Sequence, residues 1–531
     1  MRPKIIFWID ASQIHFCIAK YIQDNLDCEM YSIFEITEKP KQFYQNQSLV
    51  NFKKNWFYHD HILKTRRKPD LKYLKTIEEK YNIPLWLIAS NDRFFNHLNE
   101  FYRFSYDEIL LILEDEIKLF EMILDEVKPN YMIMHETHQQ QNHIFYEICK
   151  ARKIKILMTT STRSSIKKIS DQTVKNNTKK RSKYSSPVLS NLSDITAEFT
   201  TQSDRFHITD ELDKFEPLPD NVKPNIYERI DLEKKFDSNP NLDSMSEKRL
   251  TSNSKYFSAF LKFLFTNDTN VQTHFTYFGR SKLKVFFKVI FFELRKKYRE
   301  RFMSENLSID IDDDLPFVYF PLHQEIERIL LIGAPFYTNQ LEQIKSVAQS
   351  LPIGYKLYVK DHPTMRMRGW RGVSEMKKIM KLQNIKLMHP LVNSDEIIKK
   401  SDLVVTIRGT SAVDAAFHNK PSIIFGNVGM FQLSFIHKLK SIEELPQAIR
   451  NSLKKRVDPK EFKKYSDAVN SESFESEFQS LIAAYEQIFH KGGYYVNVEI
   501  ESDKLDSFLK KYKNEFTKLA LYHIAKMKEL N

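Results

Sequence analysis

The feature that most constrains this chain is an alternation of short apolar runs with amphipathic stretches. The alternation occurs over residues 4–158 and again over residues 317–426, with a polar stretch between the two blocks. It is typical of βαβ units, in which a helix connects two parallel strands of one sheet. The sequence therefore predicts an α/β fold with two Rossmann-like domains and a polar, flexible insertion between them.

The first block contains one strong helix signal. Ser105 and Glu108 form a capping-box pattern, apolar residues follow at helical spacing, and Pro129 ends the segment. We expect helices at 12–25, 105–127 and 138–151, and strands at 4–10, 28–36, 130–136 and 153–158.

The second block predicts an open, mostly parallel, doubly wound sheet. Its expected strands are 317–322, 356–360, 385–388, 403–407 and 421–426. Ligands of such sheets bind outside the carboxyl ends of the strands, so polar residues that end strands are the first candidates for a site.

Composition divides the rest of the chain. The expected units are a first α/β domain (1–160), an irregular polar insertion (161–255), a helical connector (256–315), a second Rossmann-like domain (316–445) and a helical region (446–531) that braces one domain against the other.

The sequence of residues 281–301 predicts a basic amphipathic helix. Eight Lys or Arg residues accompany an apolar face formed by Leu283, Phe286, Phe287, Ile290 and Leu294. Such a helix can lie on an anionic membrane. It can also pack on the second domain while its lysine stems cover apolar surface, which is the interpretation we favour.

Charge and cysteine content limit the function classes. Lys and Arg outnumber Asp and Glu by 81 to 69, but the cations collect in the polar insertion and one helix rather than interleaving with aromatics, which disfavours nucleic acid. Three cysteines without a CxxC pair predict neither a disulfide framework nor a zinc knuckle. The N-terminal apolar run is too short for a signal peptide or a membrane span, so we expect a cytoplasmic protein, with the inner face of the membrane as an alternative.

Two strand ends in the second block suit an anion. In "LVVTIRGTSAVDAA", Gly409 permits a tight turn, Thr410 or Ser411 can cap the next helix, and free N–H groups beside Arg408 can hold a phosphate. Asp414, one turn further, can accept hydrogen bonds from sugar hydroxyls.

In "YVKDHP", Lys360 supplies a positive charge, His362 can bind a phosphate or a base, and Pro363 ends the strand. Either segment alone has an ordinary structural explanation. Two such ends in one sheet favour a binding site.

Together with "FVYFPLHQEIER", these segments resemble the capsule polysaccharide biosynthesis family, which includes bacterial capsule Kdo transferases. The resemblance covers residues 316–445 well and 1–160 more loosely. It is carried by His323, Glu327, Arg328, Tyr337, Gln340, Lys360–Pro363 and Thr406–Gly426. This chain departs from the family pattern at Asp361, Asp414, Ile326 and Asn419, where the family has Glu, Glu, Pro and Gly.

The resemblance implies a metal-independent, GT-B-like glycosyltransferase of capsule-type polysaccharide synthesis. Its co-substrate would be a nucleotide-sugar, with a CMP-sugar as one candidate, and no other cofactor is expected. The second domain would hold this donor, and the first a glycan or lipid-linked acceptor. The candidate donor ligands are His323, Arg328, Lys360, His362, Arg408, Gly409, Thr410, Ser411 and Asp414.

The catalytic carboxylate is expected at a strand end of the first domain. Asp10 is one candidate, and Glu136, between His135 and His138, is the other; His135 is a further catalytic candidate beside Glu136. For the "HETH" segment, three alternatives stay open: a base or nucleophile, a helix cap, and a metal pair. Two other functions also remain, a sugar-nucleotide epimerase and a non-catalytic polysaccharide assembly or export factor bound to the membrane through 281–301.

Overall fold

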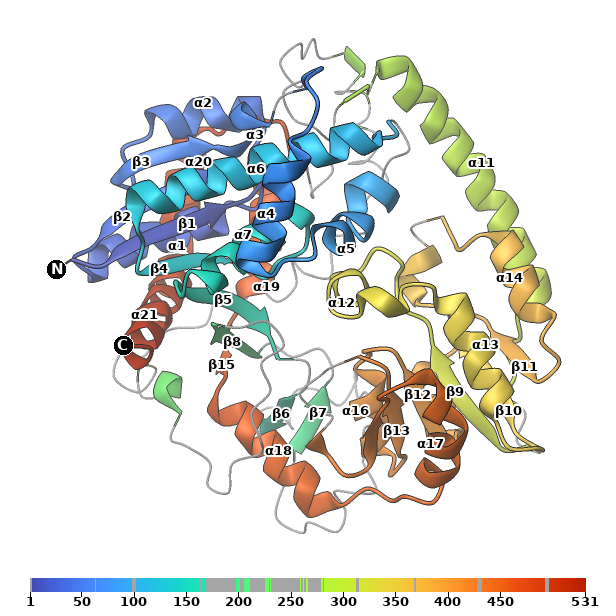
Figure 1. The fold of residues 1–531 in the computed structure, drawn as a ribbon. Coiled ribbons are helices and arrows are strands. Elements are labelled where there is room, and N and C mark those ends of the chain that lie inside the picture. Colours follow the sequence, from blue (N-terminus) through green and yellow to red (C-terminus); the bar gives the residue numbers. More distant parts are fainter. Residues whose placement is uncertain are drawn as a thin grey trace.

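The computed structural model describes residues 2–62, 64–97, 102–162, 281–311, 315–366, 369–426, 432–491 and 496–531, with short stretches between 165 and 279. Most of the expected insertion at 161–255 lies outside the described residues. Within the described part, two larger sheets form, and each is buried on both faces by helices (Figure 1).

The first sheet has seven strands in the order β15-β8-β5-β4-β1-β2-β3. The first five strands along the chain run parallel, whereas β8 is antiparallel to β5 and β15 is antiparallel to β8. The strands are β1 (Lys4–Ile9), β2 (Glu29–Phe34), β3 (Phe52–Phe57), β4 (Tyr131–His135), β5 (Lys155–Ser161), β8 (Arg205–Thr209) and β15 (Phe474–Glu475). The strands β3, β8 and β15 were not predicted from the sequence.

Side chains alternate between two cores on opposite faces of this sheet. From β1, Ile5, Phe7 and Ile9 enter one core, and Ile6 and Trp8 enter the other. The first core also receives α1 (Ile14–Asn25), α2 (Glu38–Asn46), α19 (Phe478–Phe489), α20 (Ser502–Lys511) and α21 (Lys513–Glu529). The second receives α4 (Leu71–Tyr81), α5 (Leu85–Ser90), α6 (Tyr106–Val127) and α7 (Gln140–Ala151).

Helix α6 has the capping box that the sequence predicts. Ser105 accepts a hydrogen bond from the Glu108 N–H, and the Glu108 side chain accepts one from the Ser105 N–H. The C-terminal helices α19–α21 lie beside the first strands, and both ends of the chain are close together in Figure 1. Residues from 474 onward thus complete the first sheet and its core.

The second sheet has six parallel strands in the order β11-β10-β9-β12-β13-β14. Numbered along the chain, this is 3-2-1-4-5-6, the Rossmann order. The strands are β9 (Phe317–Pro321), β10 (Lys356–Lys360), β11 (Ile385–Met388), β12 (Leu403–Thr406), β13 (Ser422–Ile424) and β14 (Ile436–Lys438). The main helices are α12 (Arg328–Leu331), α13 (Gln340–Ser350), α14 (Val373–Met380), α15 (Ser394–Lys400), α16 (Ser411–Phe417) and α17 (Leu445–Ser452). The predicted fold class, α/β with two Rossmann-like domains, is confirmed.

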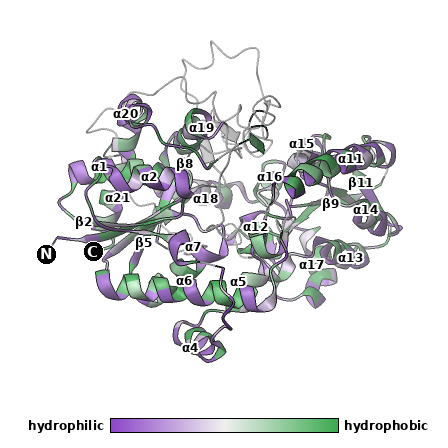
Figure 2. Ribbon diagram, turned by 90° about the horizontal axis from the view of Figure 1, so that it is seen from above, coloured by the Kyte–Doolittle hydropathy of each residue, from purple (hydrophilic) through white to green (hydrophobic). Residues whose placement is uncertain are grey.

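Helix α11 (Lys282–Asn306) runs along the outer edge of the molecule, beside α14 in both ribbon views (Figures 1 and 2). The five residues of its predicted apolar face are exposed, by 38% at Phe286 to 72% at Leu283. Helix α11 packs on the second domain, as the favoured interpretation expects, but through the side that carries Arg299 and Met303, so the predicted apolar face stays exposed. Among the described residues, no helix is long and apolar enough to cross a membrane.

Candidate functional site

Most of the predicted site residues follow strands where the chain order reverses in each sheet, and the segment from Lys360 to Pro363 lies at the end of the adjacent strand β10. In the first sheet this switch point lies between β1 and β4, followed by Asp10 and Glu136. In the second it lies between β9 and β12, followed by His323 and the loop that begins at Ile407. Open α/β sheets bind ligands at such crevices.

His323 organises the loop after β12. Its Nε2 accepts a hydrogen bond of 3.2 Å from the Arg408 N–H and lies 3.3 Å from Thr406 Oγ1. Because Nε2 is an acceptor, the ring proton belongs on Nδ1, which lies 3.9 Å from Glu327 Oε2. The Gly409 N–H donates to Thr406 Oγ1 at 3.1 Å, and a Cβ at Gly409 would come within 2.6 Å of that oxygen. A tight loop thus closes over the histidine.

Arg408 lies inside the second domain. Its side chain is completely buried, and a Cβ at Gly333 or at Gly426 would overlap its guanidinium or its methylene groups. In this position Arg408 supports the loop instead of presenting its charge to a ligand, contrary to the expected contact with a donor phosphate.

The hydroxyls after this loop differ from the expected caps. Thr410 precedes α16 but makes no side-chain hydrogen bond to the helix N-terminus. Ser411 Oγ is buried and has no hydrogen-bond partner among the described residues. Burial, with Asp395 nearby, raises the pKa of Asp414 to about 8. Asp414 can therefore donate a hydrogen bond to a sugar hydroxyl as well as accept one.

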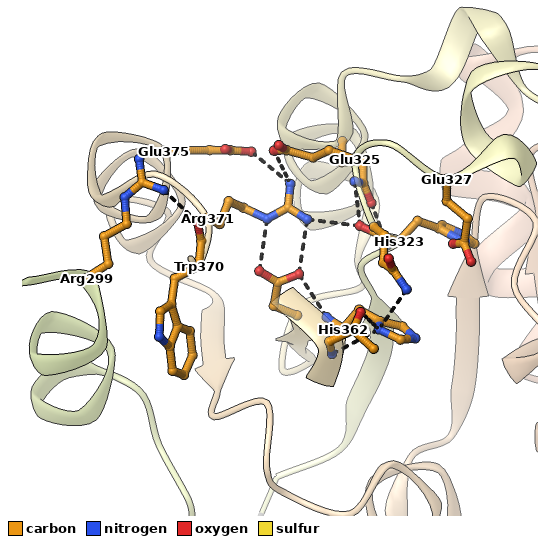
Figure 3. Close-up of polar contacts among 12 residues, drawn as sticks. Arg299, His323, Glu325, Glu327, His362, Trp370, Arg371 and Glu375 are labelled. Carbon is orange, nitrogen blue, oxygen red and sulfur yellow. Dashed lines mark hydrogen bonds and ion pairs between the residues drawn. The ribbon is translucent and has the colours of Figure 1, made fainter. Parts of the chain in front are cut away.

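The strand end "KDHP" is held by an arginine that the sequence reading missed. Arg371 is 2% exposed and contacts both carboxylate oxygens of Asp361 at 3.1 Å. It also contacts Glu325 at 2.7 Å, Glu375 at 3.5 Å and the His323 carbonyl at 3.0 Å (Figure 3). A buried carboxylate requires a cation or several hydrogen-bond donors. Asp361, at the end of a buried strand, could therefore have indicated that a partner such as Arg371 exists.

Lys360 and His362 point to different surroundings. Lys360 is 3% exposed, its Nζ donates to the Pro390 carbonyl at 3.3 Å, and burial lowers its pKa to about 8. His362 is only partly buried, and its Nδ1 lies 2.7 Å from Thr364 Oγ1 and 3.4 Å from Gln324 Nε2. Burial also lowers the pKa of His362. Of the two, only His362 is placed to meet a ligand directly.

Asp10 lies among histidines at the first switch point. Its Oδ1 accepts hydrogen bonds from the Ser12 N–H at 3.0 Å and the Ser12 hydroxyl at 2.5 Å. Burial opposes ionisation, but His135, His15, His138 and Ser12 outweigh it, so the pKa of Asp10 is lowered. Burial lowers the pKa of His138 to about 4. Asp10 is thus an ionised carboxylate beside a neutral His138 ring at neutral pH.

Glu35 is a second carboxylate that the sequence reading missed. It directly follows β2, and its N–H donates to the Ile9 carbonyl at 2.8 Å, which places it next to Asp10. Its carboxylate accepts hydrogen bonds from Trp8 Nε1 at 2.9 Å and Gln141 Nε2 at 2.7 Å. Burial, with a contribution from Asp10, raises the pKa of Glu35 to about 8. Two neighbouring carboxylates with pKa values displaced in opposite directions are typical of an acid and base pair.

Glu136 joins the two domains. Its Oε1 lies 2.8 Å from Arg328 NH1, and Arg328 Nε donates to the Thr137 carbonyl at 2.7 Å. A predicted catalytic residue and a predicted donor ligand are therefore paired with each other. At the start of α7, Asn142 Oδ1 accepts hydrogen bonds from the N–H groups of His138 and Gln139, so Glu136 is not the cap of this helix. Among the described residues, no three His, Cys, Asp or Glu side chains are grouped to hold a metal.

A cavity of about 180 Å³ lies between the domains. Small-molecule pockets commonly measure roughly 300–1,000 Å³, so this space is smaller than a nucleotide-sugar needs. Helices α5 and α7 line it from the first domain and α12 from the second; its residues include Leu87, Asp92, His138, Gln140, Leu331 and Pro335.

No family model matches this chain, and no curated protein matches it. Among solved structures, it is similar to the β-Kdo 2,7 transferase KpsC of Thermosulfurimonas dismutans (13% identity, TM-score 0.27, 62% of this chain and 78% of that one). It is also similar to the β-Kdo 2,4 transferase KpsC of that organism (9% identity, TM-score 0.29, 64% and 79%). A third similar structure is UDP-GlcNAc 2-epimerase of Methanocaldococcus jannaschii in complex with UDP-GlcNAc and UDP (11% identity, TM-score 0.26, 88% and 98%). Scores this low do not establish a shared fold, so the fold assignment rests on the sheet topology.

Proposed function

We propose that this protein is a glycosyltransferase of capsule-type polysaccharide synthesis, which transfers a sugar from a nucleotide-sugar to a glycan or lipid-linked acceptor. One observation carries the proposal. Polar side chains follow the switch points of both Rossmann-like sheets, and Arg328 and Glu136 join the two sites across the domain boundary. An enzyme with two substrates needs one site for each at a common cleft.

The donor belongs at the switch point of the second sheet. His362 and the buried Ser411 hydroxyl, which has no partner among the described residues, are its proposed ligands, together with the backbone of Gly409 and Thr410. Arg408 and Lys360 support these groups from inside the domain. Oriented N–H and hydroxyl donors can stabilise the charge of a leaving phosphate without a metal.

Asp10 is the proposed general base. It would accept the proton of the acceptor hydroxyl while that oxygen forms its bond to the sugar carbon. The bond between the sugar and the nucleotide phosphate breaks at the same carbon, and the phosphate leaves with the electron pair. A base of this kind must be ionised near neutral pH, which the lowered pKa of Asp10 supports.

The pair of Asp10 and Glu35 favours a second candidate on the same fold. A base and a neighbouring protonated acid could remove a proton from a sugar carbon and return one, as a sugar-nucleotide epimerase requires. Incubation of the donor alone in deuterated water separates the two functions. An epimerase would isomerise the sugar and introduce deuterium, whereas a transferase would leave the sugar unchanged.

The test of the proposed function is binding and turnover with a panel of CMP-, UDP-, GDP- and dTDP-sugars. We expect Asp10→Asn to reduce kcat by about a hundredfold or more while donor affinity is kept. His362→Ala and Ser411→Ala should weaken donor binding. Asp24→Asn, which alters an exposed carboxylate paired with Lys20 on α1, is the matched control. Absence of binding and turnover with every donor would contradict the proposal.

A further inference from the structure

Helix α11 presents a continuous apolar surface to solvent. Seven large apolar residues along it are 38% to 72% exposed: Leu283, Phe286, Phe287, Ile290, Phe291, Leu294 and Tyr298. At about 100° per residue, they occupy one stripe of roughly 140° of the helix circumference. We call this set the α11 stripe.

Cations border one side of the α11 stripe. The helix carries eight Lys and Arg residues and three Glu residues. By the same helical spacing, Lys284, Lys288 and Arg295 form a row along one side of the stripe. Lys288 and Arg295 form no ion pair with any residue that the structure describes.

The opposite side of α11 is fixed to the protein. Arg299 NH1 donates to the carbonyls of Gly369 at 3.1 Å and Trp370 at 2.8 Å (Figure 3). A Cβ at Gly369 would come within 2.7 Å of the Phe292 ring, and Met303 is buried in the core of the second domain. These contacts hold the helix in one rotation, with the α11 stripe directed outward.

We propose that the α11 stripe docks on the surface of an anionic lipid bilayer. The helix would lie in the plane of the interface, with its apolar side chains among the acyl chains and its bordering cations at the lipid phosphates. A second copy of the chain is a poorer occupant. Two such helices, each with eight Lys and Arg against three Glu, would repel each other, and the centres of protein interfaces are depleted of lysine.

The test is cosedimentation of the full chain with vesicles, without any nucleotide. The vesicles contain phosphatidylcholine alone or an equimolar mixture with phosphatidylglycerol. One variant removes part of the stripe (Leu283→Ser, Phe287→Ser, Leu294→Ser), and another removes the bordering charges (Lys284→Gln, Lys288→Gln, Arg295→Gln). The matched controls change exposed residues elsewhere: Ile309→Ser, Ile353→Ser and Leu391→Ser for the first, and Lys53→Gln, Lys72→Gln and Lys75→Gln for the second.

We expect the unmodified chain and both controls to bind the phosphatidylglycerol vesicles and to dissociate at high salt. Each cation removed should weaken binding about fivefold, so the charge variant should bind about a hundredfold more weakly. The stripe variant should lose binding at any salt concentration. Equal binding to neutral vesicles, or unchanged binding of the stripe variant, would overturn the proposal. So would lipid-free self-association that the stripe variant abolishes. Because no nucleotide is present, these outcomes are independent of the proposed enzymatic function.

Discussion

The two switch points occupy equivalent places in two similar sheets, yet they hold their charges differently. Beside the second, after β10, Asp361 is neutralised by Arg371, which also contacts Glu325 and Glu375. At the first, Asp10 lies beside Ser12 and titratable histidines, Glu35 accepts hydrogen bonds from Trp8 and Gln141, and the pKa values of the two carboxylates move in opposite directions. A buried carboxylate paired with an arginine fixes a geometry, whereas carboxylates beside histidines and neutral donors can exchange a proton. The second domain is therefore suited to hold a ligand, and the first to perform proton transfer.

The strongest test of this difference is to remove Arg371, the cation that neutralises Asp361. Arg371→Met leaves Asp361 buried without its partner, so we expect the free energy of unfolding to fall by about 3–5 kcal/mol. Urea unfolding followed by far-UV circular dichroism measures the change.

Arg366→Met is the control for that variant. Arg366 pairs with Glu300 at 3.4 Å, but its side chain is 47% exposed, so the expected loss is under about 1 kcal/mol. Equal effects of the two substitutions would show that Arg371 does not fix the second switch point.

The next prediction concerns the proton at Glu35. Its pKa of about 8 in the folded protein exceeds the ordinary 4.5, so the protonated form contributes stability that is present at low pH and is lost as pH rises towards 8. The native protein should therefore lose stability relative to Glu35→Gln across this range. Allowing for partial exposure of the carboxylate, we expect about 2 kcal/mol in total, measured as urea midpoints at several pH values.

Glu499→Gln, which changes an exposed carboxylate, should give a stability curve parallel to that of the native protein. If Glu35→Gln also gives a parallel curve, the Glu35 carboxyl group does not keep its proton in the folded protein over this pH range.

A smaller effect is expected at Gly426, where a Cβ would lie 2.6 Å from Arg408 Cγ and 2.7 Å from Cδ. Gly426→Ala should cost about 1–2 kcal/mol, because the close packing of Arg408 leaves no room for a methyl group. In the Arg408→Ala background the same change should cost less, and a double-mutant cycle measures this coupling. Additive effects would mean that Arg408 does not fill the space beside Gly426.

The smallest change in stability among these site variants is expected at the boundary between the two domains. Arg328→Met removes the ion pair with Glu136 and the hydrogen bond to the Thr137 carbonyl, and should cost about 1 kcal/mol. Its larger effect should be on shape, because these contacts hold the domains together over a cavity of about 180 Å³. Small-angle scattering should give a larger radius of gyration for Arg328→Met than for Lys345→Met, which alters an exposed pair. Equal radii would show that the ion pair does not restrain the domains.

The sequence predicted what depends on local pattern. The capping box of α6, the alternation of strands and helices, and the location of His323, Arg408 and Asp10 after strands all follow from nearby residues. Contacts between residues far apart in the sequence do not follow from such local patterns. Arg328 and Thr137 are 191 positions apart, and their contact depends on how two domains pack. The same limit applies to α11, where the periodicity gave an apolar face but the tertiary contacts of Arg299 and Met303 decide which side faces the protein.

The closure of the first core by α19–α21 has a consequence for synthesis on the ribosome. The core of the second domain on the β9, β10 and β12 side uses residues between Met303 and Ile449, a single stretch of chain. One core of the first domain combines Ile5 with Leu519 and Met527. The strands that are translated first must therefore wait for helices that are translated last, and the second domain can finish folding before them. The nascent first sheet would expose its apolar face throughout that interval, which makes it the part of the chain most dependent on chaperones.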